Sequence, residues 1–142
     1  KRGVFRAAID RYIGGPDAAR SAIDAAESAR TAALDLLTGS VVRYTGETTP
    51  TGCMAATSVI SCSPAAADIQ AEVAAIRKTV EDALRARIEI DVTKGVLPPS
   101  TDARILAAHV MAVLQGLSTL ARDGADRDKL MRIVDLAMTV WP

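Results

Sequence analysis

Apolar positions along this chain recur mainly at the three- and four-residue spacing of an amphipathic helix. Residues 1–13 carry one such stripe, and the Gly-Gly-Pro run at 14–16 ends it. A second long helix is predicted from Asp17 through at least Leu37, with a turn or two more as far as Tyr44. Together these patterns indicate two helices in the first third of the chain.

The middle of the chain holds its clearest loop and its least certain segment. Residues 45–52 are small, polar and punctuated by Gly and Pro, which is typical of a loop. The apolar run at 53–62 does not separate helix from strand by its periodicity. We expect a helix there because the sequence shows no hairpin partner. Ser63 and Pro64 then fit the N-cap and the first residue of another helix.

Three further helices are predicted in the second half of the chain. One runs from 64 to 94 and ends before Gly95, with a seam of alternating four- and three-residue spacing. The next begins after Pro98-Pro99, capped by Ser100, Thr101 or Asp102, and ends before Gly124. The last begins at Asp126. The expected seam residues of the first of these helices are Ile69, Val73, Ile76, Val80, Ala83 and Arg87.

The last two helices are apolar on more than one side. The fifth has a broad stripe of Leu and Val and a separate face of small residues around His109. A helix that buries one side needs an apolar stripe only somewhat wider than about 100°, and the last helix exceeds this. We therefore predict a homodimer in which these helices form a four-helix arrangement about a two-fold axis. The predicted interface residues are Ile105, Ala112, Gly116, Leu117, Leu130, Val134, Ala137 and Trp141.

Composition supports an all-α fold and limits the classes of partner. The chain has 142 residues, 3% aromatic, and is rich in Ala and Arg, which favour helices. Its 17 basic residues balance its 17 acidic residues, so the basic stripe of a nucleic-acid-binding surface is not evident. Arg77, Lys78, Arg85 and Arg87 alternate with acidic residues, which indicates a solvated, ion-paired face. No apolar run of membrane-spanning length and no signal-peptide core is visible.

The sequence offers little chemistry. His109 has no nucleophile paired with it by any motif, and it fits either a hydrogen-bonded core residue or the polar anchor of a small-molecule cavity. Gln115 fits either solvated surface or a pocket. Cys53 and Cys62 would lie about 13 Å apart on one helix, too far for a disulfide, so reduced thiols are favoured over a redox pair. We expect no enzyme activity, no metal site and no cofactor.

Five motifs, in order and with matching intervals, resemble one branch of the TetR/AcrR family of transcriptional regulators. The first is the opening Lys-Arg-Gly-Val-Phe-Arg-Ala-Ala, which resembles the helix that follows the recognition helix in that family. The motifs extend over essentially the whole chain, although Thr51 stands where the branch usually has Arg. The other four are Thr-Gly-Cys-Met-Ala-Ala at 51–56, Val-Leu-Pro with Asp at 96–102, Leu-Gln-Gly-Leu at 114–117, and the last helix ending in Trp-Pro at 141–142.

The resemblance implies a bundle of five to six helices, with residues 1–142 as one effector-binding and dimerisation domain. It implies a cytoplasmic regulator, most simply a repressor, that binds an unidentified small molecule between helices and thereby changes operator affinity. The helix-turn-helix that contacts operator DNA is expected upstream of Lys1. The alternative is a helical dimerisation or scaffold module without a ligand. By facing and family geometry, the expected effector-binding residues are Phe5, Ile9, Tyr12, Met54, Thr57, Val80, Leu84, His109 and Gln115.

Overall fold

The computed structural model describes residues 3–4, 7–8, 11, 17–48, 50–52 and 67–142, and these contain helices and turns without a β-strand. The all-α prediction is therefore confirmed for this part of the chain. The predicted segment at 53–62, the cap at 63–64, both cysteines and most of the predicted helix 1–13 lie outside the described residues. The helices are α2 (Ala18–Ala25), α3 (Ala29–Tyr44), α5 (Ala67–Thr93), α6 (Ala103–Arg122), α7 (Arg127–Ala137) and the short 3-10 helix η2 (Met138–Val140).

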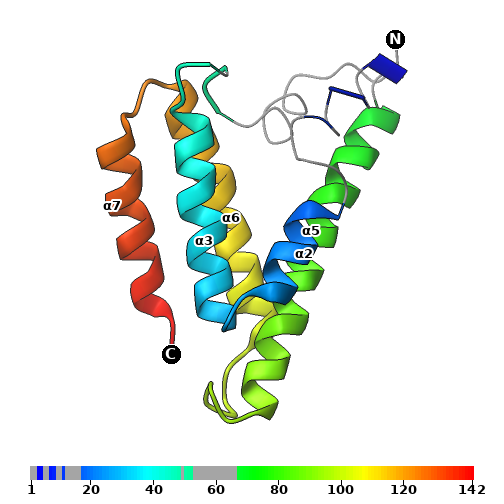
Figure 1. Cartoon of the computed structure of the whole chain (residues 1–142), viewed down its shortest axis with the longest axis vertical. Helices are drawn as coiled ribbons and strands as arrows, with labels where there is room; N and C mark the ends of the chain where they lie inside the picture. Colours follow the sequence, from blue (N-terminus) through cyan, green and yellow to red (C-terminus); the bar gives the residue numbers. More distant parts are fainter. Residues whose placement is uncertain (1–2, 5–6, 9–10, 12–16, 49, 53–66) are drawn as a thin grey trace.

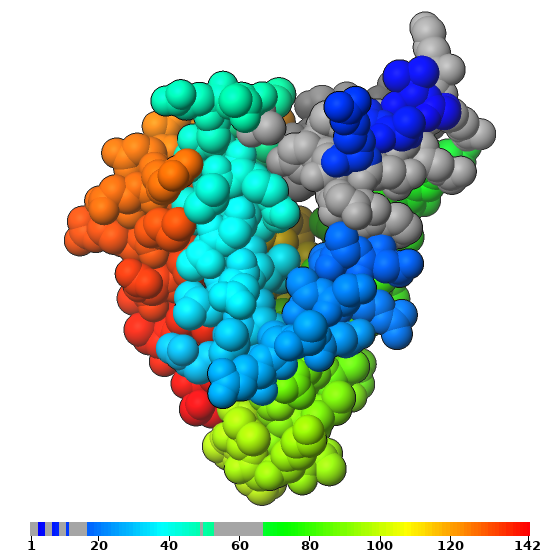
Figure 2. Space-filling view, in the orientation of Figure 1, coloured from blue at the N-terminus to red at the C-terminus, as the bar shows by residue number. Residues whose placement is uncertain are grey.

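The helices form two groups that meet along α6. In Figure 1, α3, α6 and α7 lie side by side, while the long α5 leans away from them with α2 along its length. Packing contacts join α5 to α6, α2 to α5, and α3 to both α6 and α7. Figure 2 shows α3 at the front, between α7 on one side and α2 on the other. This arrangement makes α3 and α6 the central helices of the bundle.

Small residues let these central helices approach closely. Ala29 and Ala33 of α3 and Ala107 of α6 are fully buried, and they share one core with Leu37 and Leu117. Ala carries little side chain beyond Cβ, so it fills the space between closely packed helices without creating voids. The high Ala content and low aromatic content of the chain are therefore consistent with closely packed helices.

The predicted helix boundaries between residues 90 and 130 are confirmed, whereas the last helix, predicted to reach Trp141, ends at Ala137 and continues only as the 3-10 turn η2. Asp102 and Asp126 cap α6 and α7, since their carboxylates accept hydrogen bonds from the backbone N–H groups of Ile105 at 3.1 Å and Lys129 at 2.8 Å. Gly95 follows α5 at φ 75°, where a residue with Cβ is strained. Local residues therefore set the end of α5, through a left-handed Gly, and the starts of α6 and α7, through Asp side chains.

The prediction of one long helix over 17–44 is wrong, because residues 26–28 are not helical and separate α2 from α3. Ala26 is extended, at φ −67° and ψ 148°, and Ser28 caps α3 by accepting a hydrogen bond from the N–H of Thr31. Gly39 lies inside α3, which continues to Tyr44. Arg87 and Asp91 of α5 form hydrogen bonds with backbone groups of residues 26, 27 and 29 at this break.

Helix α6 has a second property that the sequence reading did not assign to it. Its 20 residues, with a mean hydropathy of 1.3 over the most apolar window, make it long and apolar enough to cross a membrane. The expectation that no segment reaches this length and composition is therefore corrected. Because the central helix of a bundle meets the same criterion, this feature is weak evidence for a membrane location.

Gly52→Ala is expected to destabilise the protein by about 1–3 kcal/mol. Gly52 has φ 83°, and a Cβ there would meet the side chain of Arg122 and lie 2.9 Å from the carbonyl oxygen of Ser118. Gly39→Ala is the matched control, because apart from the backbone of α3 itself no described atom lies within 4 Å of its Cβ position. Helical Ala is also favoured over Gly by roughly 0.5–1 kcal/mol. Urea unfolding measures both, and equal effects of the two substitutions would contradict the packing at Gly52.

Candidate effector and dimer site

The structure brings two of the predicted effector residues onto one helix. Leu84 of α5 is fully buried in the core, and Val80, one turn earlier, is half-buried against it. Five of the predicted residues lie outside the described residues, so the other side of the expected pocket is not defined. These are Phe5, Ile9, Tyr12, Met54 and Thr57.

His109 joins the last two helices. It is half-buried on α6, and its Nε2 lies 3.2 Å from the carbonyl oxygen of Ala137 at the end of α7. A carbonyl only accepts, so Nε2 carries the proton in this contact. His109 thus has the backbone partner that one of its two interpretations required. Gln115 is exposed on α6, as its surface interpretation requires.

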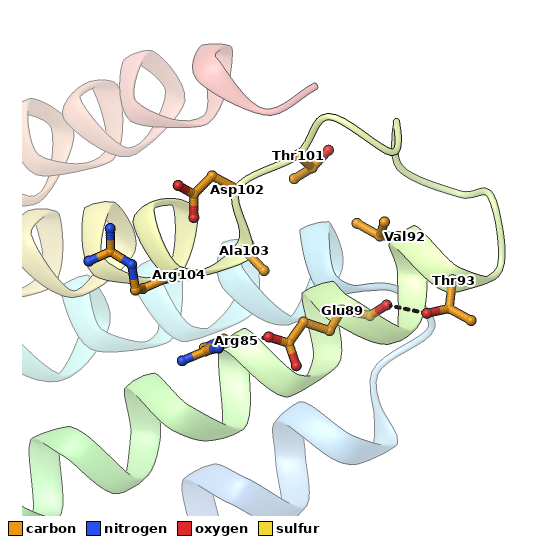
Figure 3. Close-up of a pocket in the computed structure, with 8 residues that line it drawn as sticks. All are labelled: Arg85, Glu89, Val92, Thr93, Thr101, Asp102, Ala103 and Arg104. Carbon is orange, nitrogen blue, oxygen red and sulfur yellow. Dashed lines mark hydrogen bonds and ion pairs between the residues drawn. The ribbon is translucent and has the colours of Figure 1, made fainter.

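A shallow groove of about 460 Å³ lies elsewhere, between the end of α5 and the start of α6 (Figure 3). Its walls are mostly polar. Arg85 pairs with Glu89 at 2.9 Å, and the hydroxyl of Thr93 donates to the carbonyl oxygen of Glu89 at 2.9 Å. Of the predicted effector residues that the structure describes, none lines this groove. The groove is therefore a different feature from the apolar interhelical pocket expected for an effector.

The small-residue face of α6 makes few contacts with the described part of its own subunit. Ile105 is 51% exposed, Ala112 and Gly116 are exposed, and apart from the backbone of α6 itself no described atom lies within 4 Å of the Cβ position of Gly116. Leu136, 71% exposed on α7, and Val140, 56% exposed on η2, add apolar surface near the end of the chain. Leu136 and Val140 are not among the predicted interface residues.

The other predicted interface residues belong to the core of one subunit. Leu117 is 1% exposed, and Leu130 and Val134 are fully buried, so their side chains have no surface to offer a second copy. Ala137 and Trp141 are half-buried, and Trp141 packs against the same core. The reason is geometrical: α7 packs against α3 as well as α6, and this contact covers one side of its apolar surface.

Arg87 and Asp91 form a buried ion pair on α5 that the sequence analysis did not predict. Arg87 had been assigned both to the seam and to the solvated face. The guanidinium Nη1 of Arg87 lies 2.9 Å from Oδ1 of Asp91, and their side chains are 11% and 3% exposed. Asp91 follows buried Leu84 and Ile88 at helical spacing, which places a carboxylate on the core side of α5. A carboxylate at a seam position, four residues after an Arg, is the sequence signal that could have revealed the pair.

By contrast, the pairs Lys78–Asp82 and Arg85–Glu89 are exposed, as expected for the solvated face.

Comparison with known proteins identifies transcriptional regulators as the class to which this fold belongs. No family model matches the chain. The HTH-type transcriptional repressor ComR of Escherichia coli (strain K12) is 31% identical over 144 residues, which cover 100% of this chain and 69% of ComR.

Solved structures agree in fold as well as sequence. The TetR family transcriptional regulator CifR, a cysteine mutant complexed with 26-bp double-strand operator DNA, matches with a TM-score of 0.89 and 30% identity. The match covers 99% of this chain and 74% of CifR. A TetR transcriptional regulator from Rhodococcus sp. RHA1 matches with a TM-score of 0.76 and 32% identity, over 99% of this chain and 75% of its own. The chain belongs to the TetR family of transcriptional regulators.

Proposed function

We propose that residues 1–142 form the effector-sensing and dimerising domain of a TetR-family transcriptional repressor. The observation that carries the proposal is the two-sided character of α6, which buries one apolar face in the core and leaves a second face of Ile105, Ala112 and Gly116 exposed. The relatives support the wider role, since ComR is named a transcriptional repressor and CifR is complexed with operator DNA.

The dimer would use the exposed part of the predicted interface. Ile105, Ala112 and Gly116 of α6 would lie against the same face of a second copy, with Leu136 and Val140 at the edge. A two-fold contact is self-complementary, so small residues on both copies would let the two α6 helices come close. The buried residues Leu117, Leu130 and Val134 would support this face from inside each subunit.

The effector would bind between helices, along the wall formed by Val80 and Leu84 of α5. His109 would act through its contact with the end of α7 rather than as a free polar anchor, because Ala137 already occupies its Nε2. Binding would favour one of two packings of the domain, and by this difference it would change the affinity for operator DNA. The protein would act in the cytoplasm, where the operator is.

A thermal-shift screen of the full-length regulator tests the effector. Against a library of lipophilic and cationic compounds, at least one compound is expected to raise the melting temperature, since a ligand at 100 times its Kd stabilises the folded state by about 2.7 kcal/mol. Val80→Trp, which fills space beside the half-buried wall, should reduce the shift while the free protein stays folded. A complete absence of stabilising compounds would favour a dimerisation module without a ligand.

Operator DNA would be bound through a helix-turn-helix upstream of Lys1 and not through this domain. The balance of 17 basic and 17 acidic residues supports this division, because phosphate contacts require an excess of Lys and Arg. In gel-shift experiments, the full-length protein should retard a DNA fragment selected from the genome, and residues 1–142 alone should not. Retardation by residues 1–142 would contradict the division.

A further inference from the structure

The break between α2 and α3 is only weakly encoded by the residues that form it. Residues 25–27 are Ala, Ala and Glu, which favour a continuous helix, and neither Gly nor Pro interrupts the segment. Ser28 is the local signal for a new helix, since its side chain accepts a hydrogen bond from the N–H of Thr31 at 3.1 Å. That cap satisfies one backbone group, whereas a break leaves several donors and acceptors without helical partners.

The Arg87–Asp91 pair of α5 satisfies three more of these groups. Nη2 of Arg87 donates to the carbonyl oxygen of Glu27 at 2.9 Å and to that of Ala26 at 3.3 Å. Oδ2 of Asp91 accepts a hydrogen bond from the N–H of Ala29, the first residue of α3, at 2.7 Å. One buried ion pair therefore serves the end of α2 and the start of α3 at once.

We propose that the Arg87–Asp91 pair is a conformational lock that holds the α2–α3 junction in its broken form. When the hydrogen bonds from this pair to the junction break, residues 26–28 become helical and join α2 and α3 into one helix. This is the conformation that their own sequence favours. The junction is then a two-state element controlled from α5. This role goes beyond the proposed effector function and does not depend on what the effector is.

The geometry makes the lock sensitive to small movements of α5. Hydrogen bonds of 2.7–2.9 Å weaken steeply with added length or misalignment, so a shift of about 1 Å would release Ala29 and Glu27. Leu84 and Ile88, fully buried on the same helix, fix the position of the pair relative to the core. Any event that displaces this part of α5 would therefore reach the junction directly.

Hydrogen exchange of the full-length regulator tests the lock. In the broken form the amides of Glu27 and Ser28 lie between the helices, whereas in a continuous helix they would donate to the carbonyls of Ile23 and Asp24. The double variant Arg87→Met with Asp91→Ala is expected to slow exchange at Glu27 and Ser28 on the order of tenfold or more. The matched control is Lys78→Met with Asp82→Ala, an exposed pair of the same spacing on α5, which should leave this exchange unchanged.

Unchanged or faster exchange at these two amides, with the rest of α3 still protected, would overturn the proposal. If the double variant does not fold, Arg87→Lys replaces it, because Lys keeps a charge near Asp91 but lacks the fork that also reaches Glu27. A smaller slowing at Glu27 and Ser28 is then expected, because Asp91 still accepts a hydrogen bond from the N–H of Ala29. Unchanged or faster exchange at both amides would overturn the proposal.

Glu27→Pro provides a second, independent arm. The extended conformation of Ala26 is one that a residue before Pro adopts readily, whereas a continuous helix across position 27 excludes Pro. Added to the double variant, Glu27→Pro should restore the fast exchange of Ser28. Exchange that remains slow in this combined variant would show that the protection does not come from helix joining.

Discussion

Leu117→Arg is expected to unfold the subunit rather than to produce a folded monomer. Leu117 is 1% exposed in the central helix α6, so the substitution removes a core side chain and places a charge among apolar neighbours. Losing a buried Leu costs about 2–5 kcal/mol, and an uncompensated buried charge costs several more. Domains of this size have only about 5–15 kcal/mol of stability. Far-UV circular dichroism and thermal melting measure the loss of structure.

Gly116→Arg, one residue earlier, is expected to do the opposite. Gly116 is exposed and, apart from the backbone of α6 itself, no described atom lies within 4 Å of its Cβ position, so the subunit should still fold. Two Arg side chains facing each other across the proposed two-fold contact should separate the dimer. Light scattering would show a monomer, and a dimer that persists in this variant would place the interface on another face.

Asp91→Ala is expected to cost about 3–5 kcal/mol, the effect of removing one partner from a buried ion pair. The substitution leaves the guanidinium of Arg87, with its side chain 11% exposed, without its carboxylate. It also removes the acceptor of the Ala29 N–H at the start of α3. Chemical denaturation of the variant and the unaltered protein gives the difference in free energy of unfolding.

Asp82→Ala is the control for this prediction. Asp82 pairs with Lys78 at 2.8 Å on the same helix, but the two side chains are 57% and 74% exposed. Exposed pairs contribute only about 0–1 kcal/mol, because water and salt screen them. Adding Arg87→Met to Asp91→Ala should recover part of the loss. A similar small effect for Asp82→Ala and Asp91→Ala would show that burial of the Arg87–Asp91 pair has no energetic weight.

Residues within a few positions of each other determined much of the fold. The Asp caps at 102 and 126 and the glycines at 95 and 124 act on their own helix ends, so the sequence predicts those ends correctly. The spacing of apolar residues in α6 likewise predicts which face is buried, because helical periodicity is a local property. In α5 only Val73 of the predicted seam is fully buried, and the fully buried Leu84 and Ile88 were not part of that seam.

The candidate site is less predictable, because it depends on which helix covers which face. The sequence identifies α7 as apolar on several sides, but only the packing of α7 against α3 decides that Leu130 and Val134 are core and Leu136 is exposed. His109 lies 28 residues from Ala137 in the chain, and no local pattern connects them.

The α2–α3 junction shows most clearly the difference between what the local sequence determines and what tertiary contacts determine. The sequence by itself determined an all-α chain that resembles the TetR family, the capped or glycine-ended helix boundaries after residue 90 and the buried face of α6, because these follow from periodicity, caps and family motifs. Only the tertiary structure decided that residues 17–44 form two helices, since Arg87 and Asp91 reach the junction from about 60 residues away. Backbone groups at a break must find hydrogen-bond partners, and here the partners come from another helix.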